Sequence, residues 1–172
     1  DLYYGSLPVV HFDDNYASYG GAVYMTGRYG LVDNCNFTNN KAINASALAY
    51  YPKSIGLVGE TRANITNCRF ENNNASEVAT VWFASSHGRI DNCDFIDNVA
   101  VNAAGVYVEI DGVTISESRF NNNDATGDGG AIYVTADGSP NTDSASDHKP
   151  TDISYCNFTD NNAGANGGAI YF

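Results

Sequence analysis

The sequence predicts an all-β fold in which short strands wind into a parallel β-helix of about six coils. Six phenylalanines recur at separations of 25, 33, 25, 25 and 38 residues, so the basic period is 25 residues with two insertions. They are Phe12, Phe37, Phe70, Phe95, Phe120 and Phe158. Each unit holds only short apolar runs between Asn and Gly residues, without the 3.6-residue periodicity of a helical solenoid. These observations favour strands over helices.

Each coil is expected to contain three strands. A short strand leads into an aliphatic residue five positions before Phe, at Leu7, Val32, Ile65, Ile90, Ile115 and Ile153. A second strand surrounds the Phe, and because residues two apart share one face of a strand, the residue two before Phe also points inward. The third strand is a Gly-Gly-Ala-Ile-Tyr-Val type segment, seen at residues 20–25, 129–134 and 167–172.

An asparagine stands three residues after every phenylalanine of the repeat. The set is Asn15, Asn40, Asn73, Asn98, Asn123 and Asn161. Asn tolerates a left-handed backbone at a turn, and its amide can bond to the equivalent amide in the coils above and below. The sequence therefore predicts a buried asparagine ladder with a structural role.

The four cysteines lie two residues before Phe, in a column that reads Val10, Cys35, Cys68, Cys93, Ser118 and Cys156. Since Val and Ser also occupy this column, it requires a small buried side chain rather than sulfur. In-register strands about 4.8 Å apart leave little room for disulfide geometry, so free stacked thiols are expected in preference to disulfides. No Cys-x-x-Cys motif pairs with His, which argues against a metal site there.

An aromatic residue follows each phenylalanine after 12 or 13 positions. The column is Tyr24, Tyr50, Trp82, Tyr107, Tyr133 and Tyr171. The flanking aliphatic residues should face the core, which turns the aromatic rings outward. The six rings either stack on one another and cover the sheet or form a platform for sugar rings or a protein partner. They are the predicted ligand-binding residues.

Both insertions, at residues 51–64 and 135–152, fall at the same corner of the coil. Such loops either carry recognition on a rigid scaffold or are tolerated surface insertions. In the second, Asp137, Ser139, Asn141 and Asp143 alternate like the first ligands of a calcium loop. Thr142 and His148 stand where such a loop has Gly and Glu, so a polar loop without calcium is expected in preference to a calcium site. No other cofactor is expected.

The outward column immediately before Phe carries a possible catalytic group. It reads His11, Asn36, Arg69, Asp94, Arg119 and Asn157, which places Asp94 between Arg69 and Arg119 on adjacent coils. A carboxylate between two cations could act as a base beside an oxyanion stabiliser. The alternative, a surface charge ladder of small energetic value, is favoured, and no dense acid cluster of the glycosidase type accompanies it. The sequence therefore does not predict an enzyme.

Composition restricts the partners of this protein. A formal charge of −12 repels phosphate backbones and anionic lipids, so nucleic-acid and membrane partners are not expected. No apolar run approaches the roughly 18 residues that span a bilayer, and any export signal or anchor is expected outside this sequence. Residues 1–172 are expected to form one β-helix domain, as a fragment of a longer protein or with an end that pairs with another copy. Five N-x-[ST] sequons suit a glycosylated exterior protein, at Asn36, Asn44, Asn64, Asn74 and Asn157.

Three segments, at residues 34–40, 127–134 and 155–171, carry a family resemblance. They read NCNFTNN, GDGGAIYV and YCNFTDNNAGANGGAIY. They resemble the adhesin-like surface proteins of methanogenic archaea and, more distantly, the repeats of chlamydial polymorphic outer-membrane proteins. The resemblance covers nearly the whole chain from Leu7 onward. It implies a single-stranded, right-handed, pectate-lyase-like parallel β-helix.

The resemblance also implies an extracellular adhesin module on a cell surface, which attaches to a glycan or protein of a host or neighbouring cell. Two alternatives remain open. The fold hosts polysaccharide lyases and hydrolases, so a carbohydrate-active enzyme is one, and a purely structural stalk is the other.

Overall fold

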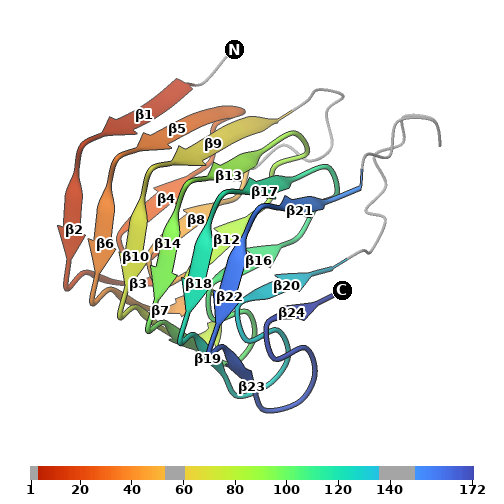
Figure 1. Ribbon diagram of the computed structural model, residues 1–172. Helices are drawn as coiled ribbons and strands as arrows, with labels where there is room; N and C mark the ends of the chain where they lie inside the picture. Colours follow the sequence, from red (N-terminus) through yellow and green to blue (C-terminus); the bar gives the residue numbers. More distant parts are fainter. Residues whose placement is uncertain (1–3, 53–60, 136–149) are drawn as a thin grey trace.

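The protein is a stack of six coils, in which four parallel sheets run along the axis of a solenoid (Figure 1). The computed structural model describes residues 4–52, 61–135 and 150–172. Within these ranges there are strands, turns and bends but no helix. The all-β solenoid predicted from the sequence is confirmed. Each coil, however, contributes four strands rather than the three expected.

The sheets are numbered in the order in which a coil visits them. The first sheet contains β1 (Tyr4–Pro8), β5 (Tyr29–Asp33), β9 (Arg62–Thr66), β13 (Arg89–Asp91), β17 (Thr114–Ser116) and β21 (Asp152–Ser154). The second contains β2 (His11–Asp13), β6 (Asn36–Thr38), β10 (Arg69–Glu71), β14 (Asp94–Ile96), β18 (Arg119–Asn121) and β22 (Asn157–Thr159). The third contains β3 (Tyr16–Tyr19), β7 (Lys41–Asn44), β11 (Asn74–Val78), β15 (Val99–Ala100), β19 (Asp124–Ala125) and β23 (Asn162–Ala163). The fourth contains β4 (Val23–Met25), β8 (Leu48–Tyr50), β12 (Val81–Phe83), β16 (Val106–Val108), β20 (Ile132–Val134) and β24 (Ile170–Tyr171).

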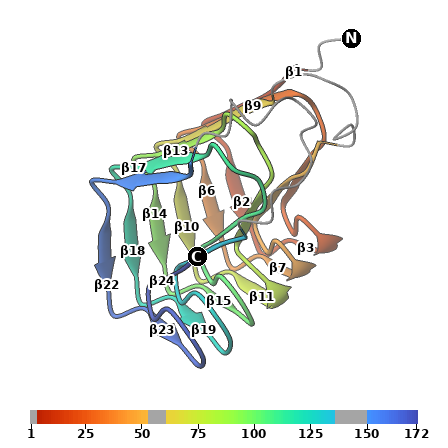
Figure 2. The same cartoon turned by 90° about the vertical axis from the view of Figure 1, so that its right-hand side faces the viewer.

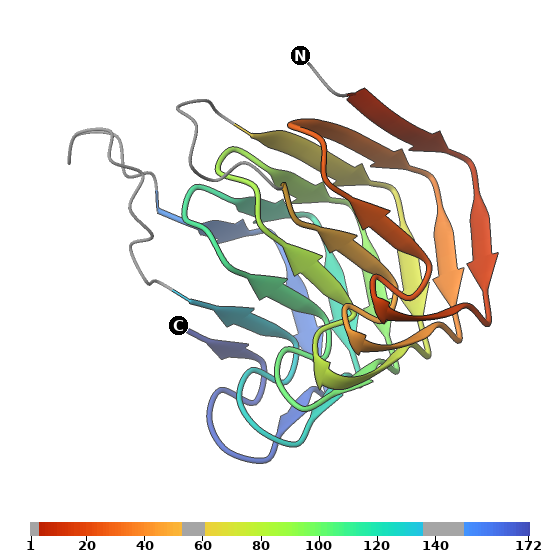
Figure 3. The ribbon, with the colours of Figure 1, turned by 180° about the vertical axis from the view of Figure 1, so that it is seen from behind.

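Every strand pairs in parallel with the same strand of the next coil, as the side view of the second sheet shows (Figure 2). Phe70, for example, pairs with Phe37 on one side and Phe95 on the other. Seen from behind, the fourth sheet runs in the same order from β4 to β24 (Figure 3). Equivalent residues of successive coils therefore lie directly above one another, and each sequence column becomes a column in space.

The phenylalanine column forms the centre of the core. Its six rings stack face to face along the axis, with centroids 4.7–4.9 Å apart and interplanar angles of 4–13°. This spacing follows from the distance between parallel strands, which brings identical rings into contact without distortion. The aliphatic column of the first sheet packs beside the stack, and Ile65, Ile90 and Ile115 are fully buried.

The third sheet is the element that the sequence analysis missed. Its strands are only two to five residues long. They bury a separate cluster of small side chains, Ala75, Ala100, Ala104 and Ala125. Alanine is depleted in strands and does not produce an alternating apolar pattern. In the sequence, this strand is therefore visible only as the constant two-residue spacing between the asparagine and the alanine of each repeat.

Each coil turns three of its corners through residues with a left-handed backbone. At the corner between the second and third sheets they are Asp14, Asn39, Asn72, Asp97, Asn122 and Asp160, with φ between 52° and 58°. Each of these directly precedes a ladder asparagine. The expectation that the ladder asparagines themselves adopt this conformation is therefore wrong. The preceding Asn or Asp absorbs the left-handed turn, because a short polar side chain lowers its cost.

The corner between the third and fourth sheets carries Gly20, Ala45, Ala79, Ala103, Gly129 and Gly167, with φ between 54° and 67°. Coils with alanine thus bend as coils with glycine do. The second glycine of the pair has a stricter role, because a Cβ on Gly130 would lie 2.0 Å from the carbonyl oxygen of Gly168. The Gly-Gly pair serves close backbone packing.

At the corner between the first and second sheets, replacing Glu117 by Asn is expected to stabilise the protein. Glu117 is exposed and has φ 50°, whereas the equivalent residue of the preceding coil is Asn92, with the same φ. Asn tolerates this conformation better than Glu, and the gain should be about 1 kcal/mol. Urea denaturation of the wild type and Glu117→Asn would measure it. An unchanged or lower midpoint would contradict the assignment of strain to this corner.

All four cysteines are free. They do not line up as isolated thiols, because the backbone N–H of Cys35 donates to Sγ of Cys68 at 3.4 Å, and Cys93 N–H donates to the Ser118 hydroxyl at 3.1 Å. A serine therefore accepts the same hydrogen bond as a cysteine, which explains why the column admits both. Cys35, Cys68 and Cys93 are buried, whereas Cys156 is half-buried.

The thiols are expected to react slowly with Ellman's reagent in the folded protein. Burial raises the pKa of Cys93 well above its ordinary value and also raises the pKa of Cys35 and Cys156, so their reactive thiolates are disfavoured. A hydrogen bond with Cys93 lowers the pKa of Cys68, but this thiol is buried and the reagent cannot reach it. No more than one thiol, that of Cys156, should react readily before unfolding, and all four should react in guanidinium chloride. Rapid reaction of two or more thiols in native buffer would contradict this packing.

Candidate functional site

The outer face of the fourth sheet carries a column of aromatic side chains. The register places Tyr24, Ala49, Trp82, Tyr107, Tyr133 and Tyr171 in one row across the six coils. These residues alternate with buried aliphatic neighbours such as Val106 and Val108. Five of the six aromatic residues singled out in the sequence thus share one outward column. The sixth, Tyr50, does not.

Tyr50 points into the core, and its assignment to the outward column is wrong. It pairs with Met25 and Phe83, its ring centroid lies 5.7 Å from that of Phe83, and only 1% of its surface is exposed. Its hydroxyl donates to the carbonyl oxygen of Gly27 at 2.7 Å, and burial raises its pKa to about 12.

The error follows from counting residues from the phenylalanine. In the fifth and sixth coils, the residue 13 positions after the phenylalanine points outward, because these coils have one more residue between the repeat alanine and the strand of the fourth sheet. The second coil lacks that extra residue. Its outward residue is therefore 12 positions after the phenylalanine, at Ala49, and Tyr50 is the next one along the strand. Successive strand residues face opposite sides, and a difference of one residue reverses the side chain.

With Ala49 in place of an aromatic ring, the column opens into a groove. The groove has a volume of about 560 Å³ and is lined by Tyr19, Tyr24, Ala49, Tyr51, Trp82 and Glu109. Alanine forms its floor, and Tyr19 reaches it from the end of β3 in the third sheet. Tyr24 and Tyr19 are 46% and 54% exposed. The sequence did not single out Tyr19 or Glu109, and it gave Tyr51 only as the first residue of the insertion at 51–64, because the groove arises from the missing ring at Ala49.

Trp82 organises the groove. Its indole N–H donates to Oε2 of Glu109 at 2.8 Å, which fixes the indole across the gap between two coils. The ring of Tyr51 stands edge-on to the indole, with centroids 6.0 Å apart and an interplanar angle of 82°. The negative charge of Glu109 raises the pKa of Tyr51, with smaller contributions from burial and Tyr24. The groove therefore has two adjoining aromatic walls and one carboxylate.

The rest of the aromatic column is closed. Tyr107 contacts Trp82 edge-on at 5.3 Å between centroids, and Tyr133 lies 5.5 Å from Tyr107 and 4.7 Å from Tyr171 in tilted stacks. These rings cover one another, as cross-strand aromatic pairs do. The column thus contains a covering stack over the later coils and an open groove over the earlier ones.

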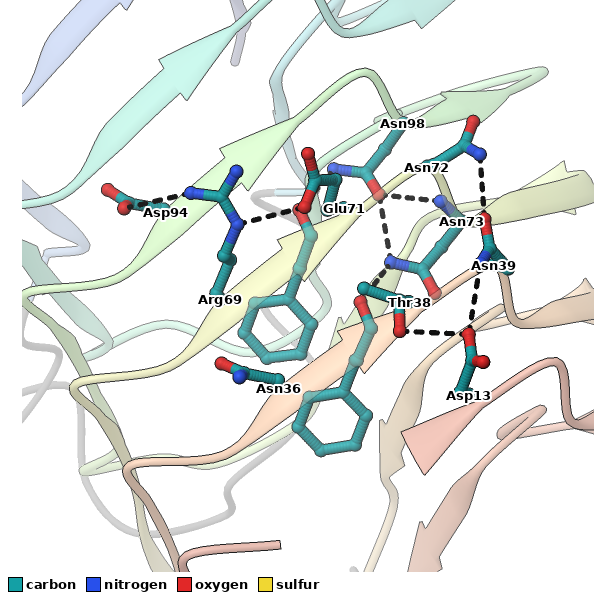
Figure 4. A network of polar contacts seen from close by, with 12 residues as sticks. Asp13, Asn36, Thr38, Asn39, Arg69, Glu71, Asn72, Asn73, Asp94 and Asn98 are labelled. Carbon is teal, nitrogen blue, oxygen red and sulfur yellow. Dashed lines mark hydrogen bonds and ion pairs between the residues drawn. The ribbon is translucent and has the colours of Figure 1, made fainter. Parts of the chain in front are cut away.

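The ladder asparagines form a continuous chain of hydrogen bonds inside the corner between the second and third sheets. Each side-chain amide donates to Oδ1 of the next, at 2.8–3.0 Å from Asn15 to Asn161. Each of the later five also donates to the carbonyl oxygen of the phenylalanine one coil before it. Figure 4 shows this for Asn73 and Asn98, beside an outer chain in which Asn72 donates to Asn39 and Asn39 to Asp13. The amides are saturated by the scaffold.

Arg69, Asp94 and Arg119 lie together on the outer face of the second sheet. Arg119 holds Asp94 through two hydrogen bonds of 2.7 Å, while Nη1 of Arg69 lies 3.8 Å from Asp94. Arg69 instead donates through Nε to Glu71 at 2.9 Å, and Figure 4 shows it between the two carboxylates. All three side chains are partly or largely exposed. The arrangement is a chain of surface ion pairs on a different sheet from the groove.

The calcium candidates Asp137, Ser139, Asn141 and Asp143 lie outside the described residues. The insertions are shorter than expected at their C-terminal ends, since residues 62–64 belong to β9 and Asp152 begins β21. Within residues 4–52, 61–135 and 150–172, no group of three or more His, Cys, Asp or Glu side chains could hold a metal ion. In the same ranges no helix is long and apolar enough to span a membrane. The sequon residue Asn44 is buried and donates to Glu77 at 3.2 Å.

Comparison with known protein families agrees with this architecture. The family model described as the right-handed beta helix region matches residues 5–147, and that of the Chlamydia polymorphic membrane protein repeat matches residues 155–172. The second match covers most of the sixth coil and supports the chlamydial part of the resemblance. No curated protein and no solved structure matches significantly. Because the first match spans most of the chain and agrees with four parallel sheets in register, this chain belongs to the right-handed β-helix family.

Proposed function

We propose that this chain is a cell-surface binding module, an adhesin, and that it recognises a glycan through the groove over Ala49. The groove is the observation that carries the proposal. In the later coils the aromatic rings contact and cover one another, whereas beside Ala49 the aromatic surface is open. A surface location is supported by the match of the sixth coil to a repeat named for membrane proteins of Chlamydia. The net charge of −12 is consistent with a soluble, exposed surface.

The chemistry of the groove suits a sugar. A pyranose ring combines an apolar face of C–H groups with a rim of hydroxyls, so it needs an aromatic wall and a polar anchor together. Trp82 and Tyr24 provide aromatic surface, and Tyr side chains add a polar tip. The carboxylate of Glu109 has lone pairs beyond the one used by the indole. The volume of about 560 Å³ lies within the range of small-ligand sites.

The scaffold favours recognition by a preformed surface. Trp82 and Ala49 lie on strands paired on both sides, and the strand residue after each, Phe83 or Tyr50, is buried. A groove held in this way loses little conformational entropy when a ligand binds.

Glycan-array binding followed by titration calorimetry would test the proposal. Trp82→Ala should weaken binding at least about tenfold, equivalent to about 1.4 kcal/mol. Ala49→Tyr should have the same effect, because it fills the groove with a residue that the column accepts at Tyr24 and Tyr107. The control Tyr171→Ala removes a ring from the far end of the column and should bind as the wild type does.

Two results would contradict the adhesin. If the wild type binds no glycan or cell surface, a structural stalk becomes the better explanation. If it degrades a polysaccharide and Asp94→Ala abolishes this, the ion pairs of Arg69, Asp94 and Arg119 are catalytic and the protein is a carbohydrate-active enzyme.

A further inference from the structure

We infer that the groove selects a sugar unit with a free amino group, which Glu109 binds as counter-ion while Trp82 and Tyr51 face the ammonium. This inference rests on the proposed glycan-binding function and narrows its ligand class. It concerns the same groove and names the residue that would distinguish an amino sugar from a neutral or acidic one.

The charge of the groove is the first argument. Among the lining residues that belong to the described part of the chain, Glu109 carries the only formal charge, and none of them is Lys, Arg or His. A concave site lined by one sign of charge concentrates ligands of the opposite sign. The whole sequence adds to this field, with twenty acidic against eight basic residues. An anionic sugar would be repelled, whereas an ammonium group would be attracted.

The aromatic geometry is the second argument. Tyr51 and Trp82 meet at 82°, so they form two walls of a corner rather than one flat platform. A flat platform suits the broad face of a neutral ring, whereas a corner surrounds a compact group from two sides. The π faces of Trp and Tyr attract cations within about 6 Å of the ring centroid, and Trp does so best. Tyr24 and Tyr19 extend the aromatic lining around the same space.

The position of Glu109 is the third argument. Its Oε2 accepts the indole N–H of Trp82 at 2.8 Å, so the carboxylate is tethered to one of the aromatic walls. A carboxylate offers about four lone-pair positions, and one indole leaves others for an ammonium donor. The charge of Glu109 also acts on Tyr51, since it is the largest cause of the raised pKa of that hydroxyl. The two walls and the counter-ion therefore act on one shared space.

Titration calorimetry with two oligosaccharides of equal length provides the test. The probes are the β-1,4-linked trimer of glucosamine and its fully N-acetylated counterpart, compared at a pH where the amine is protonated and at two salt concentrations. The wild type is expected to bind the amine trimer at least about tenfold more tightly, with a preference that falls as salt increases.

Glu109→Gln is the decisive variant. Gln keeps an acceptor for the indole N–H but lacks the charge, so the preference for the amine trimer over the acetylated trimer should fall to within about twofold. Glu117→Gln is the matched control, because it removes the same charge from an exposed corner between the first and second sheets. It should leave the preference unchanged.

The outcomes separate the inference from the proposed function. Equal affinity for both trimers, or equal losses in Glu109→Gln and Glu117→Gln, would overturn the amino-sugar assignment. If array glycans then still bind in a Trp82-dependent manner, the adhesin function stands. If no glycan of any class binds, both the function and the inference fall.

Discussion

Asn98→Ala is expected to lower the free energy of unfolding by about 4 kcal/mol. Asn98 is fully buried at the middle of the ladder. Its Oδ1 accepts from both the backbone N–H and the side-chain amide of Asn73, each at 3.0 Å. Its own amide donates to the Phe70 carbonyl and to Asn123. The substitution leaves several buried polar groups without partners, and each costs about 1–3 kcal/mol.

Urea denaturation followed by circular dichroism would measure this loss. Asn121→Ala is the matched control, because Asn121 is exposed on β18, and its effect should stay within about 0.5 kcal/mol. Hydrogen exchange would add a local measurement, since the amide of Asn73 loses its acceptor and should lose protection. A loss below about 1 kcal/mol for Asn98→Ala would show that the ladder adds little beyond the backbone pairing.

Phe95→Ala is expected to destabilise the protein by a similar amount, about 4 kcal/mol. Phe95 is fully buried, and its ring stacks at 4.7 Å on both Phe70 and Phe120. The change removes the transfer free energy of the ring and leaves a cavity between two rings that the in-register strands hold apart. Because those strands keep their spacing, the stack has little freedom to collapse into the gap.

The same denaturation experiment applies, with Phe172→Ala as the matched control, since Phe172 is 67% exposed. Phe95→Leu should cost clearly less than Phe95→Ala, because Leu refills part of the volume. If both substitutions had the small effect of the control, the phenylalanine stack would not be the main source of core stability.

These effects bear on the groove as well as on stability. Trp82 and Ala49 are fixed through strands whose buried neighbours belong to the same core as the phenylalanine stack. A loosened core should therefore weaken ligand binding indirectly. Binding assays on groove variants consequently need a stability measurement beside them. Glu109→Gln leaves the buried side chains in place, whereas Ala49 is only 2% exposed, so Ala49→Tyr needs this measurement most.

Residue identities along the chain are enough to predict the inward half of this protein. Each inward column must repeat a side chain that fits the equivalent one 4.7–4.9 Å away, as the phenylalanine rings do. The chemistry of such a column is therefore visible in the sequence as repetition. This explains why the period, the core and the ladder partners were predicted. It also explains why the third sheet was missed, since its buried column is only alanine.

The outward half depends on register that only the folded coils supply. Tyr50 and Ala49 exchange their expected sides because the second coil lacks one residue that the fifth and sixth contain. Side chains alternate along a strand, so that one-residue difference buries a predicted ligand-binding ring and opens a gap beside Trp82. Tyr19, Tyr51 and Glu109 reach this gap from three different coils. Their proximity is a consequence of stacking, and no spacing along the chain predicts it.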